Sequence, residues 1–251
     1  DTYNFKENSN IGVFTFREID TIVSILAILK LNCTFVPIDP EYPLERISYM
    51  IDNSKLKYII TVKPFDKKLS LNTNIINIDK NSINSYSTKF NKKLNYNIEN
   101  NLYIVFTSGS TGKPKGIALK HKNMINLIFY ELYTSNMFNN IKNLRILQFA
   151  TMSFDVSYQE IFTALLGAGT LVLINDADRK NINKLTTYIL DKNIGILFIP
   201  PAYLRLLVEK DYNISSLIKT IKIIITAGEP LVITEGIRKL LYNNIKLYNH
   251  Y

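Results

Sequence analysis

The sequence has few residues of the types that build disulfide-rich or metal-binding proteins. Its 251 residues include one cysteine, Cys33, and two histidines, His121 and His250. A single cysteine cannot form an internal disulfide, and the two histidines are too far apart for a zinc motif. We therefore predict a fold without disulfide bonds, no metal ligands within this chain, and a reducing, cytoplasmic environment.

A secretory or membrane-spanning segment is also missing. The first six residues, Asp-Thr-Tyr-Asn-Phe-Lys, have neither the basic start nor the apolar stretch of a signal peptide. No later run approaches the roughly 18 uninterrupted apolar residues that a transmembrane helix requires. The sequence thus predicts no membrane partner.

Charge and hydropathy are those of an ordinary globular protein. Hydrophobic residues make up 47% and charged residues 20% of the chain, which excludes the disordered and fibrous classes. The net charge of +9 would suit a nucleic-acid-binding protein. The lysines, however, are scattered among asparagine and isoleucine, as in proteins of AT-rich genomes, and form no basic patch along the sequence. We therefore predict no nucleic-acid partner.

Apolar runs alternate with segments of helical period, which predicts an α/β fold with largely parallel β-sheets flanked by helices. We expect a helix at 18–31, a strand at 34–38, a helix at 44–51 and a strand at 57–62. Residues 63–101 are rich in Asn, Lys and Ser and read as a variable, looped stretch with one strand at 74–78. From Leu102 onward, short strands and helices alternate as far as a last strand beginning at Lys246.

The most informative segment follows the predicted strand at 102–106. Residues 107–116 read Thr-Ser-Gly-Ser-Thr-Gly-Lys-Pro-Lys-Gly. Glycines let backbone N–H groups approach an anion, hydroxyls add donors and lysines supply positive charge, so the segment predicts a phosphate-binding loop. It is not a Walker A loop, because Pro114 follows Gly112-Lys113, and it lacks G-x-G-x-x-G. A plain surface turn is the alternative, since the same residue types favour turns.

Residues 102–127, which contain this loop, resemble the signature segment of the AMP-forming adenylating superfamily, which includes acyl-CoA synthetases, luciferases and peptide-synthetase adenylation domains. The resemblance implies the fold of the N-terminal subdomain of an acyl-adenylate-forming enzyme. It also implies that the loop holds the outer phosphates of ATP and the departing pyrophosphate. By this likeness the phosphate contacts come from Thr107, Ser108, Gly109, Ser110, Thr111, Gly112 and Lys113, while Lys115 supports the loop or the anion.

Two further segments resemble motifs of peptide-synthetase adenylation domains. Residues 25–54 contain a Pro-Ile-Asp-Pro turn that we expect to be structural, with Leu-Asn-Cys at 31–33 where relatives have small residues and glycine. Residues 149–174 resemble the motif that places an aspartate, here Asp155, at the amino-acid pocket. By spacing alone Asp155 is a helix N-cap, with Glu160 in the same local network. By resemblance, its carboxylate pairs with the α-ammonium group of an amino acid.

The likeness extends to the adenine site near the end of the chain. Residues 223–230 form a strand that runs into a glycine turn, in which Gly228, Glu229 and Pro230 would border the adenine. The alternative is a simple strand-to-helix connection. The final residues resemble the start of an Asn-x-Tyr-Gly-Pro-Thr-Glu motif, in which Asn249 would contact the base and Tyr251 would stack on it.

The family's amino-acid specificity positions also carry over to this sequence. The resulting set resembles that of proline-activating domains and consists of Asp155, Val156, Gln159, Phe198, Ile225, Ala227 and His250. Four of these residues would line a compact apolar pocket suited to a small aliphatic ring. Gln159 and His250 have no obvious partner in proline.

The resemblance implies ATP-dependent and Mg²⁺-dependent activation of an amino acid, with proline as the candidate from the pocket residues. It also implies transfer of the acyl group to the phosphopantetheine thiol of a carrier domain. Carrier and condensation domains are the expected partners. We expect residues 1–251 to be a partial AMP-binding domain, truncated at both ends and inactive alone, because the family's catalytic lysine would follow Tyr251. An acyl-CoA or aryl-acid ligase and a non-catalytic nucleotide-binding remnant are the alternatives.

Overall fold

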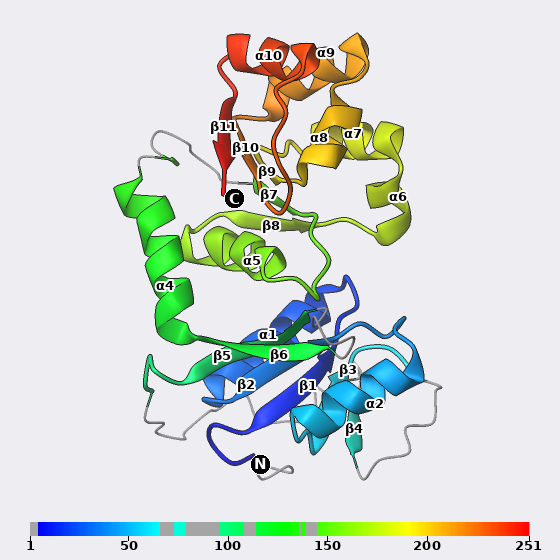
Figure 1. The fold of residues 1–251 in the computed structure, drawn as a ribbon, viewed down its shortest axis with the longest axis vertical. Coiled ribbons are helices and arrows are strands. Elements are labelled where there is room, and N and C mark those ends of the chain that lie inside the picture. Colours follow the sequence, from blue (N-terminus) through cyan, green and yellow to red (C-terminus); the bar gives the residue numbers. More distant parts are fainter. Residues whose placement is uncertain are drawn as a thin grey trace. The chain divides into compact units, whose positions relative to one another are not determined.

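The chain folds into two compact units, residues 1–127 and 128–251. The computed structural model describes residues 5–65, 73–78, 96–107, 114–135, 137–138 and 145–250. Each unit contains one β-sheet with helices packed on it (Figure 1). The α/β class predicted from the sequence is confirmed. None of the helices in these ranges combines the length and hydropathy that crossing a membrane would require.

The sheet of the first unit has the strand order β4-β3-β1-β2-β5-β6. All neighbouring pairs run parallel except β5 and β6, which pair antiparallel. Its strands are β1 (Asn10–Phe14), β2 (Thr34–Ile38), β3 (Tyr58–Thr61), β4 (Asn74–Asn77), β5 (Asn101–Thr107) and β6 (Lys115–Lys120). The antiparallel β5–β6 pair departs from the predicted alternation, because β6 follows β5 as a second strand before α4 (His121–Phe129) begins.

Two helices pack against this first sheet and its core. α1 (Ile19–Lys30) packs on β1 and β2 through Ile22, Ile25 and Ile28. α2 (Leu44–Asn53) begins directly after Pro43, as predicted, and buries Ile47, Met50 and Ile51 in a cluster with side chains of β1, β2, β3 and β5. The central strands are buried on both faces, which explains why their sequences are continuous apolar runs without polar alternation.

Asn32 shows how the chain tolerates the Leu-Asn-Cys departure at the end of α1. Its φ angle is 56°, in the left-handed region where helices commonly end on glycine. Asparagine is the next best residue there, because its short amide can form local hydrogen bonds. The Asn32 amide donates to Glu7 Oε2 at 3.2 Å and accepts from Asn100 Nδ2 at 3.1 Å. The Leu-Asn-Cys segment therefore contains a left-handed residue, Asn32, that is held by side-chain hydrogen bonds.

The sheet of the second unit is parallel throughout, with the order β11-β10-β9-β7-β8. From β7 the chain passes to β8 on one side and then to β9 on the other, so the order reverses between β7 and β9. In open parallel sheets, ligands bind beyond the carboxyl ends of the strands at such a reversal. The strands are β7 (Arg145–Gln148), β8 (Thr170–Leu173), β9 (Ile196–Phe198), β10 (Ile223–Thr226) and β11 (Lys246–Asn249).

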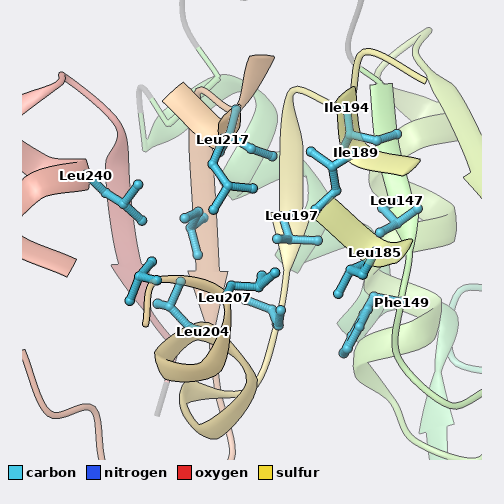
Figure 2. Close-up of a cluster of buried hydrophobic side chains, with 14 of the residues drawn as sticks. Leu147, Phe149, Leu185, Ile189, Ile194, Leu197, Leu204, Leu207, Leu217 and Leu240 are labelled. Carbon is cyan, nitrogen blue, oxygen red and sulfur yellow. The ribbon is translucent and has the colours of Figure 1, made fainter. Parts of the chain in front are cut away.

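Alternate residues of these strands supply two separate cores, as the period of a strand requires. Leu147, Leu197 and Ile224 face the larger core, where Figure 2 shows their neighbours Leu185, Leu204, Leu217 and Leu240. These leucines come from α7 (Ile182–Asp191), α8 (Pro201–Leu207), α9 (Asp211–Thr220) and α10 (Glu235–Tyr242).

The opposite face of the second sheet carries Ile146, Ile196, Phe198, Ile223 and Ile225. These side chains form a smaller core with Ala164 of α5 (Val156–Leu166) and with Leu132 of η1, a π-helical turn at Tyr130–Thr134. The residues predicted for the amino-acid pocket belong mainly to this face and to the strand ends next to it.

Most predicted elements have counterparts in the structure, with ends that differ by a few residues. The helices expected at 18–31 and 44–51 and the strands expected at 34–38, 57–62 and 74–78 are observed. Four elements were not predicted: β1, β6, α6 (Asp176–Lys180) and α9. They are short or rich in polar residues, so packing against the rest of the unit decides their conformation. The remainder of the variable stretch, residues 66–72 and 79–95, lies outside the described residues.

We predict that Gly236→Ala destabilises the second unit. A Cβ atom at Gly236 would lie 2.4 Å from the carbonyl oxygen of Val208 and 2.9 Å from the Val208 side chain. Alanine favours a helix over glycine by about 1 kcal/mol, but the overlap should outweigh this and cost about 1–3 kcal/mol. Thermal melting should show a lower transition temperature for the variant.

Gly195→Ala is the matched control, because the nearest atom to its Cβ would be the Thr220 carbonyl oxygen at 4.0 Å. Its melting temperature should stay close to that of the wild type. Equal melting temperatures for the two variants would contradict the close approach at Gly236.

Candidate functional site

A pocket of about 460 Å³ opens at the carboxyl ends of β7, β9 and β10, within the second unit. It lies where the strand order reverses, which is the ligand-binding position expected for this type of sheet. The lining residues come from the strand ends and the segments that follow them, from the first turns of α5 and α8, and from α6. They are Phe149, Ala150, Thr151, Phe154, Asp155, Val156, Gln159, Arg179, Phe198, Ile199, Pro200, Tyr203, Ile225, Ala227, Gly228 and Glu229.

The walls of the pocket are mostly apolar. Phe198 and Ile225 are buried residues of adjacent strands, and Val156 packs against the same core from the first turn of α5. Phe149 and Tyr203 meet edge to face, with ring centroids 5.2 Å apart, on the other side of the strand ends. Apolar walls with few polar groups are typical of sites that bind small organic molecules.

Asp155 is the residue that precedes α5, as its N-cap. Its Oδ1 accepts a hydrogen bond from the Val156 backbone N–H at 2.9 Å. The side chain is exposed and lines the pocket, and among the described residues Oδ2 has no hydrogen-bond partner. The N-cap interpretation of Asp155 is therefore correct for one oxygen, while the second remains available to a cation in the pocket.

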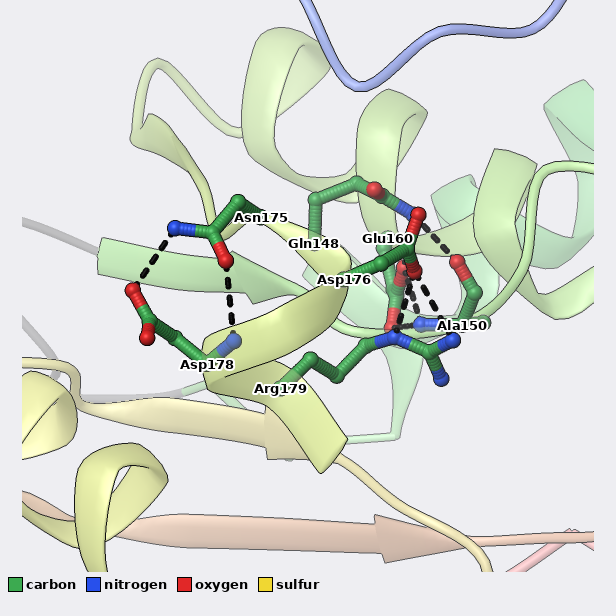
Figure 3. Close-up of polar contacts among 7 residues, drawn as sticks. All are labelled: Gln148, Ala150, Glu160, Asn175, Asp176, Asp178 and Arg179. Atoms are coloured by element: carbon green, nitrogen blue, oxygen red, sulfur yellow. Dashed lines mark hydrogen bonds and ion pairs between the residues drawn. The ribbon is translucent and has the colours of Figure 1, made fainter. Parts of the chain in front are cut away.

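Glu160 does not share a network with Asp155, contrary to the sequence-based expectation. It is fully buried and accepts hydrogen bonds from the backbone N–H groups of Phe149 and Ala150 at 3.1 and 2.9 Å. Gln148 Nε2 donates to its other oxygen at 3.0 Å (Figure 3). Because Glu160 lies one turn into α5, its carboxylate ties that helix to the end of β7. This contact holds in place the chain segment that forms one pocket wall.

A second buried carboxylate, Glu131, lies on η1 and is 1% exposed. It accepts hydrogen bonds from Gln159 Nε2 and, at 3.0 Å, from Thr163 Oγ1. His250 Nδ1 lies 3.8 Å from its Oε1 and 3.2 Å from Gln159 Nε2. Gln159 and His250, the predicted specificity residues without an obvious partner in proline, thus contact each other and the buried Glu131.

Burial governs the protonation of this cluster. It raises the pKa of the Glu131 carboxyl above its usual range, although the hydrogen bonds from Gln159 and Thr163 act in the opposite direction. It lowers the pKa of the His250 imidazole, which is therefore neutral at pH 7. A neutral imidazole whose Nδ1 accepts from Gln159 carries its proton on Nε2.

The residues predicted for the adenine site lie at the ends of β10 and β11. Gly228 has a φ angle of 86°, so a non-glycine residue would be strained there. Glu229 Oε2 accepts a hydrogen bond from the Ala202 N–H at 3.3 Å, in the first turn of α8. Pro230 is exposed and does not line the pocket. The Asn249 side chain lies 3.5 Å from Thr226 Oγ1. Glu229 thus has a structural contact as well as a place in the pocket.

The predicted phosphate loop belongs to the first unit. Thr107 is the last residue of β5 and pairs in register with Lys115, the first residue of β6, and both are exposed. The predicted contacts Ser108, Gly109, Ser110, Thr111, Gly112 and Lys113, and also Tyr251, lie outside the described residues. The two strands therefore define where the loop begins and ends.

Comparison with known proteins identifies the family. The profile described as AMP-binding enzyme matches residues 3–251. The chain belongs to the AMP-binding enzyme family. The match covers nearly the whole chain and includes both units.

Curated relatives of the chain include two peptide synthases, gramicidin S synthase 2 and tyrocidine synthase 2. The chain is 39% identical to gramicidin S synthase 2 of Brevibacillus brevis over 247 residues, which cover 98% of the chain and 5% of that protein. It is 39% identical to tyrocidine synthase 2 of Brevibacillus parabrevis over 244 residues, or 97% of the chain and 7% of that protein. The chain thus spans a small part of the length of these relatives.

Solved structures with the same fold include the N-terminal subdomain of NpsA from Klebsiella oxytoca in complex with 3-hydroxybenzoyl-AMSN. The TM-score is 0.80 at 20% identity, over 98% of this chain and 60% of that one. A second crystal form of the subdomain gives a TM-score of 0.81. At this identity the similarity establishes the fold, which is that of the N-terminal subdomain predicted from the sequence.

Several residues at the site were not predicted from the sequence. Phe149, Tyr203 and Arg179 line the pocket, and Glu131 lies behind Gln159. Arg179 is held by Asp176 at 2.9 Å on α6, as Figure 3 shows, and its guanidinium lies 5.4 Å from the centre of the Phe149 ring. Of these residues, only Glu131 could have been recognised from the sequence, because it is an acid within an otherwise apolar and aromatic helix face.

The described residues lack the arrangements of side chains that bind metal ions. No group of three or more His, Cys, Asp or Glu side chains there has the arrangement of a metal site. The expectation that this chain contributes no metal ligand stays a prediction.

We predict that Glu131→Gln gains stability relative to the wild type as the pH rises. An acid whose pKa is higher in the folded than in the unfolded protein retains a proton that the unfolded chain has lost, so the wild type loses stability with increasing pH. At pH values below the pKa of Glu131 in the unfolded chain, the stabilising contribution of the protonated carboxyl is fully present. The melting temperature of the variant minus that of the wild type should therefore increase between about pH 4 and about pH 7.

Glu235→Gln is the control, because Glu235 is exposed in the first turn of α10. Its difference from the wild type should vary little over the same range. A pH-independent difference for Glu131→Gln would show that burial does not perturb this carboxyl.

Proposed function

We propose that this chain is the amino-acid-binding and nucleotide-binding part of an adenylation domain, which activates an amino acid, proline, for nonribosomal peptide synthesis. The observation that carries the proposal is the exposed Asp155 carboxylate at an apolar pocket, in a chain of the AMP-binding family. The similarity to segments of gramicidin S synthase 2 and tyrocidine synthase 2 supports an amino acid over other acids.

Asp155 favours a substrate with an ammonium group. Its Oδ1 is engaged by the Val156 N–H, which fixes the orientation of the carboxylate, and Oδ2 would accept from the substrate cation. A fatty acid or aryl acid without an amine would leave this negative charge without a partner. Asp155 therefore disfavours the acyl-CoA and aryl-acid ligase alternatives, whereas a remnant without activity would be revealed by the exchange assays below.

The pocket composition favours proline. Val156, Phe198, Ile225 and Ala227 offer apolar surface to a small aliphatic ring. None of these four can form a side-chain hydrogen bond with a polar substrate, so serine or asparagine would be bound less well. The Gln159 amide nitrogen contacts Glu131 and His250, so its hydrogens are already engaged within the protein.

In the proposed reaction the amino-acid carboxylate attacks the α-phosphorus of ATP, pyrophosphate leaves, and an aminoacyl-adenylate remains. Residues of this chain would act by positioning and by neutralising charge. Asp155 holds the ammonium group, and Gly228, Glu229, Pro230, Asn249 and Tyr251 would border the adenine. The loop from Thr107 to Lys113, with Lys115 behind it, would hold the phosphates.

The chemistry of these donors fits a nucleotide triphosphate. Thr107 and Lys115 are exposed at the two ends of the loop, where a hydroxyl and an ammonium group can meet an anion. Mg²⁺ would neutralise charge on the triphosphate when bound. We further propose that the acyl group passes to the phosphopantetheine thiol of a carrier domain, and that carrier and condensation domains are neighbours in a longer protein.

Asp155→Ala should abolish amino-acid-dependent ATP–pyrophosphate exchange in the complete adenylation domain that contains residues 1–251. Loss of a charge partner for the ammonium group should lower kcat/KM for the amino acid at least about 100-fold. Asp191→Ala, which removes an exposed aspartate from the end of α7, should leave exchange unchanged. Unchanged exchange in Asp155→Ala would remove this residue from the substrate site.

A screen of the twenty amino acids by the same exchange assay should show the highest kcat/KM for proline. The physical reason is the match between a small ring and the apolar walls formed by Phe198 and Ile225. A clear preference for an aromatic or charged amino acid would overturn the pocket assignment while leaving amino-acid activation intact. Absence of exchange with every amino acid would overturn the proposed function.

A further inference from the structure

The cluster beneath the pocket contains an acid that the proposed function does not use. Glu131 is 1% exposed, and among the described residues no lysine or arginine forms an ion pair with it. A buried carboxylate without a cationic partner is costly unless hydrogen bonds satisfy it. Here the bonds come from Gln159 and Thr163, which lie one turn apart on α5 and therefore face the same side.

The hydrogen bonds of the cluster determine the orientation of the Gln159 amide. Nε2 has two hydrogens, and its two neighbours are Glu131 Oε1 and His250 Nδ1, the latter at 3.2 Å. Both neighbours are acceptors when Glu131 is ionised and His250 is neutral, so both hydrogens are used. The reversed amide would place its carbonyl oxygen against the carboxylate, which is repulsive. Glu131 therefore selects one of the two amide orientations.

Three separate elements meet at this amide. Glu131 belongs to η1, Gln159 to α5, and His250 follows β11, where its backbone N–H extends the sheet by donating to the Thr226 carbonyl at 2.8 Å. The π-helical turn is closed by a hydrogen bond from the Ser135 N–H to the Tyr130 carbonyl at 2.8 Å. Such turns place a side chain where a regular helix would not, and they are frequent at functional sites.

We propose that Glu131 is a positioning residue for substrate selection, which holds Gln159 in the floor of the amino-acid pocket and keeps it in contact with His250. Gln159 lines the pocket and Glu131 does not, so Glu131 acts on the substrate only through Gln159. Without the carboxylate, the Gln159 side chain can rotate away from its place in the pocket lining, so the floor is no longer closed. The inference rests on the proposed function, because it concerns how that pocket recognises an amino acid.

A double-mutant cycle in the complete adenylation domain tests the proposal. The four proteins are the wild type, Glu131→Ala, Gln159→Ala and the double variant, assayed by pyrophosphate exchange with the amino acid that the wild type prefers. Glu131→Ala should raise KM for the amino acid about tenfold and leave KM for ATP within about twofold. The double variant should be no worse than the more impaired single variant, because both remove the same contact.

Ring size provides a second readout, which a purely structural role would not move. With proline as the preferred substrate, Glu131→Ala should raise the kcat/KM of the six-membered homologue pipecolate relative to proline, since an open floor accommodates a larger ring. Glu131→Gln, which keeps one acceptor for Gln159, should restore much of the wild-type preference. This variant also keeps the test decisive if Glu131→Ala does not fold.

The outcomes separate the two proposals. If the wild type activates its amino acid, two results would overturn the positioning role. One is a fold-change in KM in the double variant equal to the product of the fold-changes in the two single variants. The other is an equal change in KM for ATP and for the amino acid. A lowered melting temperature with unchanged KM and ring selectivity would also overturn it. A wild type without any amino-acid-dependent exchange would instead overturn the proposed function, and this inference with it. Glu235→Ala, at an exposed acid on α10, should match the wild type throughout.

Discussion

Parallel pairing of β7, β9 and β10 is the constraint on which the rest of the site depends. The pairs Ile146–Ile196 and Ile196–Ile223 hold these strands in register, so they end together at one edge of the sheet. Each strand then delivers its next residues to the same space. The buried Glu160 carboxylate adds to this by tying the end of β7 to α5 through two backbone N–H groups. Pocket walls that are far apart in the sequence become neighbours for this reason.

Asp155 illustrates how one side chain serves both structure and recognition. A carboxylate has two oxygens, and the helix start uses only Oδ1. The N-cap contact fixes the side chain, which reduces the conformational entropy that binding would otherwise cost. A structural role for Asp155 therefore supports, and does not compete with, the proposed contact to an ammonium group. Glu229 has a similar double position, since it meets the first turn of α8 while lining the pocket.

The polar cluster of Glu131, Gln159 and His250 contrasts with the apolar walls above it. An apolar cluster of similar volume could fill the same space without the desolvation cost of a buried acid. What hydrogen bonds add is direction: they specify which way the Gln159 amide points, whereas hydrophobic packing is non-directional. This distinction gives a physical reason for an acid at a position that does not touch the pocket.

The sequence by itself determined the α/β class, the main helices and strands, the family resemblance and some of the residues that line the pocket, such as Asp155 and Gln159. These follow from local periodicity and from motifs whose residues are contiguous, such as the loop beginning at Thr107 and the segment around Asp155. Even the unusual Asn32 turn was marked by its departure from the expected glycine. The antiparallel β6 was not predicted, because its sequence carries no sign of the strand beside which it lies.

Only the tertiary structure decided which residues share the pocket and what satisfies the buried polar groups. Glu131 and Gln159 are 28 residues apart, and Gln159 and His250 are 91 apart, so no local pattern relates them. The same holds for Glu160, whose partners lie at the end of β7 and not beside Asp155, as spacing had suggested. Hydrogen bonds between distant segments depend on how strands and helices pack, and that packing is a property of the whole unit.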